Sequence, residues 1–276
     1  MFAGAPGAGK TTAALIMAIR TGVPTLYFSA DSDEITMAAR AACAVSGHGY
    51  STVRESQVNG LYDELYGEQI NELPIRFVFD PSEPSLDDIA NGINAWVELW
   101  GDTPSLVIVD NLMNMRNDDS GNEWQGMRQT VKALHWMARR TKACVWLLHH
   151  TSEQDDRWIT SAPPRSAIQG KLAQLPEVVL TMANHEGILW LAIAKNRHGK
   201  SDPLAKDPLR IIVDFVTMRL WDTPMMQGGS YAPGGSQNVS YVPEQYRNGS
   251  VEAPGGGGFE RQDGFGNSAH AAPGRR

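Results

Sequence analysis

The chain has only two cysteines among its 276 residues, Cys43 and Cys144. They lie far apart and neither belongs to a C-x-x-C pair, which argues against a zinc site and favours a reducing cytoplasm. No run of about 18 apolar residues occurs, so the sequence predicts no membrane span. The N-terminus has no basic segment followed by an apolar stretch and a cleavage site, so no secretory signal is expected.

An excess of basic residues is also lacking, because the formal net charge is −7. After residue 223, four arginines and four acidic residues cancel one another, so the preceding part carries this charge. Domains that bind nucleic acid usually present a broad basic surface. Any contact with DNA must therefore be local, at a pore or an interface.

Residues 4–11 match the phosphate-binding pattern G-x-x-x-x-G-K-[ST]. Glycines let consecutive backbone N–H groups turn inward around phosphate oxygens, which a Cβ would obstruct. Lys10 is placed to reach the β- and γ-phosphates, and the Thr11 hydroxyl to hold Mg²⁺. A helix over 12–20 would point its N-terminus at the phosphates. The expected nucleotide-binding residues are Gly4, Ala5, Pro6, Gly7, Ala8, Gly9, Lys10, Thr11 and Thr12.

Strands and helices alternate through most of the chain. Apolar runs predict strands at 24–29, 75–79, 105–110 and 143–148. Capping residues and glycine stops predict further helices at 33–46, 50–72, 85–100 and 122–140. Later hairpins are expected from strands at 178–182, 189–194, 209–214 and 217–221. This order predicts an α/β fold whose mainly parallel sheet is flanked by helices and ends in antiparallel strands.

Two segments break this alternation. Residues 151–164 are polar and predict a mobile loop, followed by a short helix over 165–174. The last part of the chain is rich in Gly, Pro, Ser, Asn and Gln, which predicts disorder. We therefore expect one domain over residues 1–223 and a tail over 224–276, which is either passive or binds a protein partner.

Carboxylates follow two of the predicted strands. Asp110 closes an apolar strand, where a protein with such a loop needs a carboxylate to hold Mg²⁺. The alternative is an aspartate that ends a strand and caps a turn. Asp31 follows another strand, at the edge where open α/β sheets bind ligands, and is the candidate that orients and deprotonates water. Asp33 and Glu34 are competitors, although the charge of Glu34 also suits the first turn of a helix.

Histidines and cations follow two later strands. His149 or His150 could sense the γ-phosphate and signal to the loop 151–164; the alternative is a strand-end histidine with a hydrogen-bonded ring. Lys195 and Arg197 are two cations at a spacing of two. They could reach the phosphates of a neighbouring subunit as an arginine finger does, or simply lie in a solvated turn.

Together these motifs resemble the RecA/DnaB-like P-loop ATPase superfamily, specifically its hexameric helicase branch. The matching segments follow the family's order: 4–12 (Walker A), 27–31, 107–110 (Walker B), 147–151 and 193–199. The last of these, Ile-Ala-Lys-Asn-Arg-His-Gly, resembles the helicase segment I-A-K-N-R-x-G and is the most discriminating. The resemblance covers residues 1–222.

The resemblance implies a RecA-like fold, ATP and Mg²⁺ as cofactors, and an ATP hydrolase that acts as a DNA helicase or translocase in replication. It implies a ring or filament of identical subunits on single-stranded DNA, with ATP between subunits and no membrane partner. The setting would be the cytoplasm of a bacterial cell or a phage-infected host. The implied catalytic residues are Lys10, Asp31, His149, Lys195 and Arg197, with Thr11 and Asp110 at the metal. The DNA-facing candidates are Arg157 and Trp158 in the loop 151–164.

Three features depart from the family pattern. The position of its catalytic glutamate holds Asp31, one methylene shorter. No N-terminal domain or linker helix precedes the loop, and only residues 1–3 come before it, so the first strand is truncated or the start lies upstream. Two other functions stay open: a recombinase or recombination mediator that forms filaments on DNA, and a regulatory ATPase that binds proteins without DNA. The acidic composition favours the latter.

Overall fold

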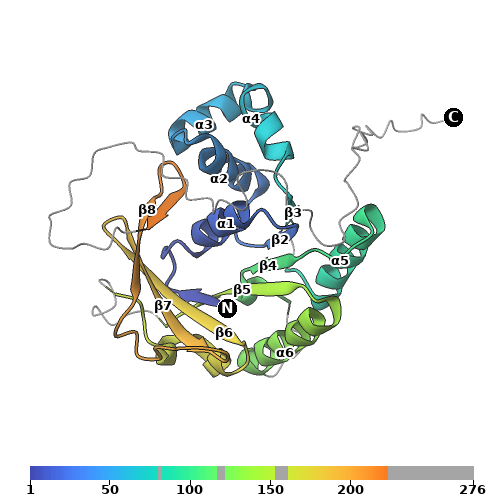
Figure 1. The fold of residues 1–276 in the computed structure, drawn as a ribbon. Coiled ribbons are helices and arrows are strands. Elements are labelled where there is room, and N and C mark those ends of the chain that lie inside the picture. Colours follow the sequence, from blue (N-terminus) through green and yellow to red (C-terminus); the bar gives the residue numbers. More distant parts are fainter. Residues whose placement is uncertain (80–82, 117–121, 153–160, 223–276) are drawn as a thin grey trace. The chain divides into compact units, whose positions relative to one another are not determined.

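The computed structural model describes residues 1–79, 83–116, 122–152 and 161–222. Within these residues, nine strands form one sheet in the order β3-β2-β4-β5-β1-β6-β7-β8-β9, with helices on both faces (Figure 1). The predicted α/β fold is thus confirmed. The predicted tail over 224–276 lies outside the described residues, as do Arg157 and Trp158 of the predicted loop.

The sheet has a parallel part and an antiparallel part. The parallel strands are β1 (Phe2–Gly4), β2 (Thr25–Ser29), β3 (Ile75–Phe79), β4 (Leu106–Asp110), β5 (Cys144–His150) and β6 (Val178–His185). The antiparallel edge consists of β7 (Ile188–Asn196), β8 (Leu209–Asp214) and β9 (Arg219–Asp222). The turn between β6 and β7 has positive φ at Glu186 (50°) and Gly187 (75°), the pattern of a tight hairpin turn.

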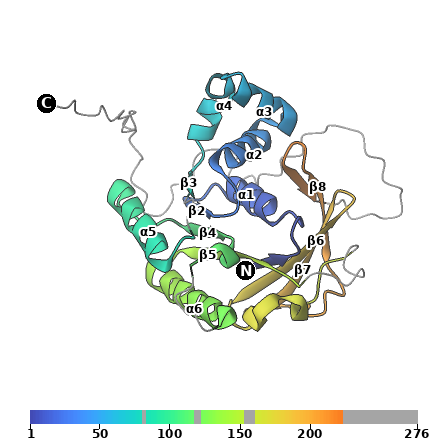
Figure 2. The same ribbon diagram turned by 180° about the vertical axis from the view of Figure 1, so that it is seen from behind.

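Helices cover the two faces of the sheet separately (Figures 1 and 2). One side carries α1 (Lys10–Thr21) and α2 (Glu34–Ser46), with α3 (Tyr50–Val58) and α4 (Tyr62–Asn71) packed on α2. The other side carries α5 (Leu86–Trp100) and α6 (Glu123–Thr141). The single helix predicted over 50–72 is two helices, because Gly60 between them adopts a left-handed φ of 70°.

Both faces of the central strands are buried, which explains their nearly continuous apolar sequences. Successive side chains along a strand point to opposite faces. In β2, Tyr27 therefore packs against α1 and α2, whereas Leu26 and Phe28 pack against α5 and α6. The same alternation holds in β4 for Ile108 and its neighbour Val107. The strands are thereby fixed in register, and so are the residues at their ends.

The short helix predicted over 165–174 is replaced by two 3-10 segments, η3 (Arg165–Ala167) and η4 (Gln169–Gln174). Gly170 (φ 66°) and Lys171 (φ 54°) have left-handed backbones, which an α-helix cannot contain. Gly170 also lies so close to the ring of Trp124 on α6 that it has no room for a Cβ. Contact with α6 therefore determines the shape of this segment.

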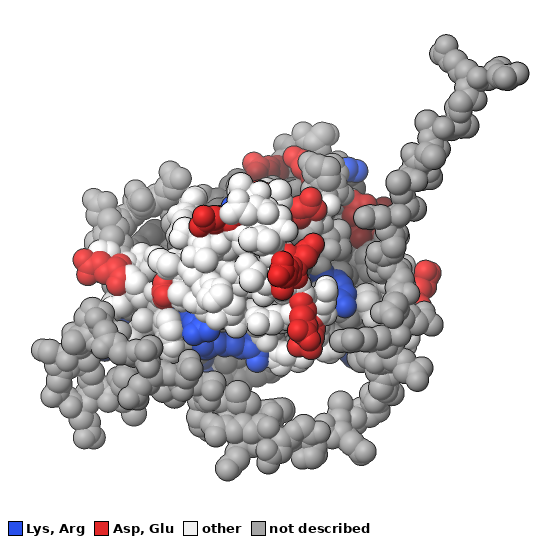
Figure 3. All heavy atoms as spheres, turned by 90° about the horizontal axis from the view of Figure 1, so that it is seen from above, with Lys and Arg blue, Asp and Glu red and all other residues white. Residues whose placement is uncertain are grey.

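Figure 3 shows acidic side chains spread over the face that α2, α3 and α4 form. Exposed acidic residues of α3 and α4 and their ends are Glu55, Asp63, Glu64, Glu68 and Glu72. The same helices expose the apolar side chains of Val58 (80%) and Leu65 (52%). This face does not have the basic character of a surface that binds nucleic acid. In the described part of the chain, no helix is long and apolar enough to cross a membrane.

Candidate active site

The parallel strands bring the predicted nucleotide-binding segments to one edge of the sheet. The β1–β5 register sets Gly4 opposite His150, and the β2–β4 register sets Ser29 opposite Asp110. Asp31 follows Ser29 directly after β2. Because the carboxyl ends of parallel strands share one edge, these residues surround a common crevice at which α/β folds bind ligands.

The loop between β1 and α1 has the backbone of a phosphate cradle. Gly4 has no room for a side chain, because a Cβ there would lie 2.7 Å from the backbone oxygen of Met182. Gly7 (φ 75°) and Gly9 (φ 84°) are left-handed, and a Cβ on Gly9 would lie 2.8 Å from the ring of Phe215. No side chain caps the N-terminus of α1, so its first N–H groups suit an anion. These residues fit the predicted nucleotide.

Lys10 lies inside this loop and is only 7% exposed. Its ammonium group donates hydrogen bonds to the carbonyl oxygens of Gly4 and Ala5, both at 3.0 Å, and lies 3.4 Å from Nδ1 of His150. Burial lowers the pKa of Lys10 to about 8, against the charge of Asp110, which raises it. A phosphate could replace the two carbonyl groups as the partner of this cation.

Asp110 lies at the end of β4 and is 1% exposed. The Tyr27 hydroxyl donates a 2.8 Å hydrogen bond to Oδ2, and the Thr11 hydroxyl also bonds this carboxylate. Burial raises the pKa of Asp110, whereas these hydrogen bonds lower it. The two residues predicted to hold Mg²⁺, Thr11 and Asp110, are therefore in direct contact.

Mg²⁺ at such a site would need oxygens from elsewhere. Among the described residues, no group of three or more His, Cys, Asp or Glu side chains gathers as a metal site. Thr11 and Asp110 offer few ligands, but Mg²⁺ is commonly held by one or two protein oxygens together with phosphates and water. The donor set therefore fits a metal that arrives with a nucleotide.

Three acidic side chains follow β2, and their surroundings differ. Asp31 is exposed, and its charge raises the pKa values of Lys10 and Asp110, so it lies near the loop. Asp33 caps α2, since its carboxylate accepts hydrogen bonds from the Thr36 backbone at 2.7 Å and hydroxyl at 3.0 Å, which lower the pKa of Asp33. Glu34 is exposed in the first turn of the same helix. This geometry favours Asp31 as the carboxylate that faces the nucleotide.

The two histidines lie within β5 and point to opposite faces. His150 lies beside Lys10, and its Nε2 is 3.5 Å from the side-chain nitrogen of Asn111. His149, the residue predicted as sensor, is fully buried; its Nε2 lies 3.3 Å from the carbonyl oxygen of Gln169 in η4. Burial lowers the pKa of His149 to about 4, so the ring is neutral. The structure therefore places His150, rather than His149, next to the predicted phosphate site.

Lys195 and Arg197 lie at the opposite edge of the sheet. Gly4 pairs with Met182 of β6, whereas Lys195 pairs with Val179 at the beginning of that strand, because β7 runs antiparallel to β6. These cations therefore lie where the parallel strands begin, away from the loop of their own chain. The prediction that they follow their strand is nearly right, although Lys195 is still part of β7.

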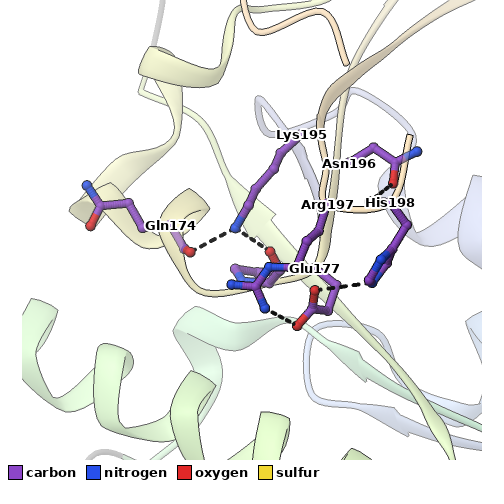
Figure 4. Close-up of polar contacts among 7 residues, drawn as sticks. Gln174, Glu177, Lys195, Asn196, Arg197 and His198 are labelled. Carbon is purple, nitrogen blue, oxygen red and sulfur yellow. Dashed lines mark hydrogen bonds and ion pairs between the residues drawn. The ribbon is translucent and has the colours of Figure 1, made fainter. Parts of the chain in front are cut away.

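The two cations are held by the segment that precedes β6, as Figure 4 shows. Lys195 donates hydrogen bonds to the carbonyl oxygens of Gln174 (2.8 Å) and Pro176 (2.6 Å). Arg197 donates a 2.7 Å hydrogen bond to Oε1 of Glu177. Burial lowers the pKa of Lys195, and the charge of Arg197 lowers it further.

Sequence reasoning missed two residues of these sites. Tyr27 could have been found, because a tyrosine in an otherwise apolar buried strand needs a partner for its hydroxyl. Glu177 directly precedes the apolar run of β6, and its pairing with Arg197 depends on the hairpin register. That register is not visible as a motif.

Residues 1–156 match the family model of the AAA domain. Gene 65 protein of Mycobacterium phage D29 is 37% identical over 229 residues, which cover 79% of this chain and 96% of that protein. Gene 65 protein of Mycobacterium phage L5 is 36% identical over 212 residues, which cover 73% of this chain and 77% of that protein.

Solved structures show the same architecture. A DnaB-like replicative helicase, described with its interactions with primase, matches with a TM-score of 0.70 and 16% identity over 81% of this chain. The chain spans 57% of the length of that helicase. A second solved structure, an isolated ATPase domain, matches with a TM-score of 0.70 and 17% identity, over 81% of this chain and 84% of that domain. At these identities the likeness shows the fold, which is that of RecA/DnaB-like ATPases, as the sequence predicts.

Proposed function

Because this chain belongs to the AAA-domain family, we propose that it is a Mg²⁺-dependent ATPase of the helicase or translocase type that acts in DNA replication. One observation carries the proposal. Lys10, Thr11 and Asp110 meet at one edge of the sheet, whereas Lys195 and Arg197 lie at the opposite edge. A head-to-tail contact between identical subunits would bring the two edges together and place ATP between them.

Each side chain of the first edge has a role in this proposal. Lys10 neutralises the β- and γ-phosphates, and the Thr11 hydroxyl and Asp110 hold Mg²⁺. When bound, Mg²⁺ neutralises charge that develops on the transferred phosphoryl group. Asp31 orients the attacking water and accepts its proton.

The second edge would act on the site of the neighbouring subunit. Arg197 would stabilise the transferred phosphoryl group in trans, a contribution typically worth about 10³-fold or more in rate. Lys195 would add a second cation to the same phosphates. ATP turnover would then depend on assembly into a ring or filament.

Single-stranded DNA is the proposed partner of the assembled protein. The acidic face of α2, α3 and α4 does not suit DNA, so the contact would be local, on the loop 151–164 with Arg157 and Trp158. An aromatic ring can stack on a base, and a cation can contact the phosphates. One solved neighbour is described as a replicative helicase, which agrees with this assignment.

The test is the ATPase rate with and without single-stranded DNA, followed by strand separation on a forked duplex. DNA-stimulated turnover and strand separation would support the helicase. DNA-stimulated turnover without strand separation, with filaments on DNA, would favour the recombinase class instead.

One observation favours a second candidate, a regulatory ATPase that binds proteins and no DNA. The face formed by α3 and α4 combines acidic residues with exposed Val58 and Leu65, a character more typical of protein contacts than of DNA contacts. An ATPase rate that does not respond to DNA, in protein that turns over ATP, would support this candidate and refute the helicase.

The split site has its own test, which mixes two inactive variants. A Lys10→Ala subunit has no functional loop but keeps Arg197, and an Arg197→Ala subunit has the converse defect. At their shared interface, one complete site is rebuilt. A mixture should therefore recover ATPase activity, more so at high protein concentration. No recovery at any ratio, with mixed oligomers confirmed by mass, would show that the site is complete within one chain.

A further inference from the structure

Glu177 connects the beginning of β6 with the residues that follow β7. Its Oε1 accepts the 2.7 Å hydrogen bond from Nη1 of Arg197, and its backbone oxygen accepts a 3.0 Å hydrogen bond from the Arg197 backbone nitrogen. Oε2 of the same carboxylate lies 3.6 Å from Nε2 of His198 (Figure 4). One acidic residue thus contacts both cationic side chains at the tip of this segment.

The guanidinium of Arg197 is held and yet remains open to contact. The side chain of Arg197 is 60% exposed, whereas that of Glu177 is 36% exposed. A guanidinium has N–H donors on several sides, so one hydrogen bond to a carboxylate leaves others that can bind phosphate. The pair therefore limits the directions that this long side chain can take without covering it.

The two cations differ in what holds them. Lys195 is bound by backbone carbonyl oxygens of Gln174 and Pro176, which no substitution removes. Arg197 is bound by a side chain, which a substitution can remove. Glu177 is therefore the position at which the orientation of one cation can be changed while the other is left in place.

Stabilisation of the fold is a poor explanation for this ion pair. Exposed ion pairs contribute little to folding, because solvent screens the charges and the side chains lose entropy. The pair would matter more for the geometry of a group that must meet a phosphate, since small displacements of a catalytic group have large effects on rate.

We infer that Glu177 is a positioning residue that holds the Arg197 guanidinium at the subunit edge, ready for the ATP bound by the neighbouring subunit. This inference rests on the proposed function, in which Arg197 acts in trans. Glu177 itself contacts neither nucleotide nor water in this arrangement. It acts through Arg197, by keeping the side chain extended toward the contact between subunits.

The first test compares Glu177→Ala, Glu177→Gln and the control Glu186→Gln. Glu186 lies at the turn of the same hairpin, with its side chain 82% exposed. Glu177→Ala should lower kcat by about 10- to 100-fold with little change in KM for ATP, because orientation of the catalytic group is lost. Glu177→Gln should recover part of this loss, because its amide oxygen can accept the same hydrogen bond. Glu186→Gln, which removes an equal charge, should behave as the unmodified protein.

The second test assigns the defect to the subunit that donates Arg197. The double variant Lys10→Ala/Glu177→Ala is mixed with Arg197→Ala and compared with the Lys10→Ala plus Arg197→Ala mixture. If Glu177 positions Arg197, the double variant should recover about tenfold less activity or worse. A second mixture places Glu177→Ala in the Arg197→Ala subunit, whose own loop is intact. That mixture should recover fully, which a general folding defect would not allow.

The outcomes separate this inference from the proposed function. If Lys10→Ala plus Arg197→Ala recovers no activity, the split site is wrong. If that mixture recovers but Glu177→Ala makes no difference in either subunit, only the positioning role is overturned. Higher activity in Glu177→Ala would also overturn it, because Glu177 would then restrain Arg197 from the phosphate. Unchanged circular dichroism and oligomer mass in each variant are required for these comparisons.

Discussion

Raising the pH should weaken ATP binding, and Lys10 should be the cause. Burial lowers the pKa of Lys10 from 10.5 to about 8, whereas the charges of Asp110 and Asp31 raise it. A bound phosphate adds negative charge beside the ammonium group and moves its pKa back toward or above the ordinary value. Between these two pKa values, the free site has lost its proton and the occupied site keeps it. ATP binding must then take up a proton, so affinity falls as pH rises.

The size of this effect follows from the two pKa values. At about pH 9, roughly a tenth of the free sites carry a charged Lys10, so Kd should be about tenfold higher than at about pH 7, a loss of about 1.4 kcal/mol. The terminal phosphate, with a second pKa of about 6, is ionised over this range and adds no comparable dependence. In the nucleotide-free protein, the unfolded chain binds this proton more tightly than the folded chain. Stability should therefore rise with pH between about 8 and 10.5.

The assay is a titration with a fluorescent, non-hydrolysable ATP analogue and Mg²⁺ at a series of pH values. The matched control is Lys10→Arg, whose guanidinium stays charged throughout. It should bind more weakly in absolute terms but with a flat pH profile. A constant Kd between about pH 7 and 9 in the unmodified protein would refute the reasoning. The same slope in Lys10→Arg would assign the proton to another group.

Three further predictions concern the carboxylates and the end of the chain. Asp31→Asn should keep nucleotide binding and lose hydrolysis in single-turnover assays, since an amide cannot accept the proton of water; normal turnover there, with loss in Glu34→Gln, would identify the other carboxylate. Tyr27→Phe should lower the free energy of unfolding by about 1.5–3 kcal/mol in urea, because buried Asp110 loses a 2.8 Å hydrogen bond. A change below about 0.5 kcal/mol would contradict this. Deleting residues 224–276 should leave the melting temperature and ATPase rate nearly unchanged, since such a composition buries little apolar area; a large drop in melting temperature would show that this segment packs on the rest.

The alternation of strands and helices could be predicted because it depends on local chemistry. Gly22 and Gly47 end α1 and α2 with left-handed backbones, and Ser85 begins α5 with a capping box. These signals involve neighbouring residues, so they are visible in sequence. The 3-10 segment η4 is different, since the left-handed backbone of Gly170 accompanies a contact with Trp124 of α6. Such a contact between distant residues leaves no local pattern.

The candidate site was predictable in its composition and less so in its orientation. The spacing of the loop placed Lys10 and Thr11, and the strand ends brought in Asp110. The choice between His149 and His150 depended on strand alternation, which was available. Leu148 packs on the side of α1, so His150, two residues later, shares that side. The prediction of His149 followed the order of a motif and did not consider which face of β5 each ring occupies.

The reversal of the chain at β7 determines how this protein must use its two cations. If Lys195 ended a parallel strand, it would lie at the same edge as Lys10, and one chain could complete the site. Because β7 runs back along β6, Lys195 and Arg197 lie where β6 begins, and Gly4 lies near the other end of the pairing. Opposite edges of one rigid sheet cannot meet around a single phosphate. Two copies in a head-to-tail contact can bring them together, and repetition of that contact gives each ATP one loop and one pair of cations. The direction of one strand thus makes the catalytic unit the interface between subunits, if these cations take part in catalysis.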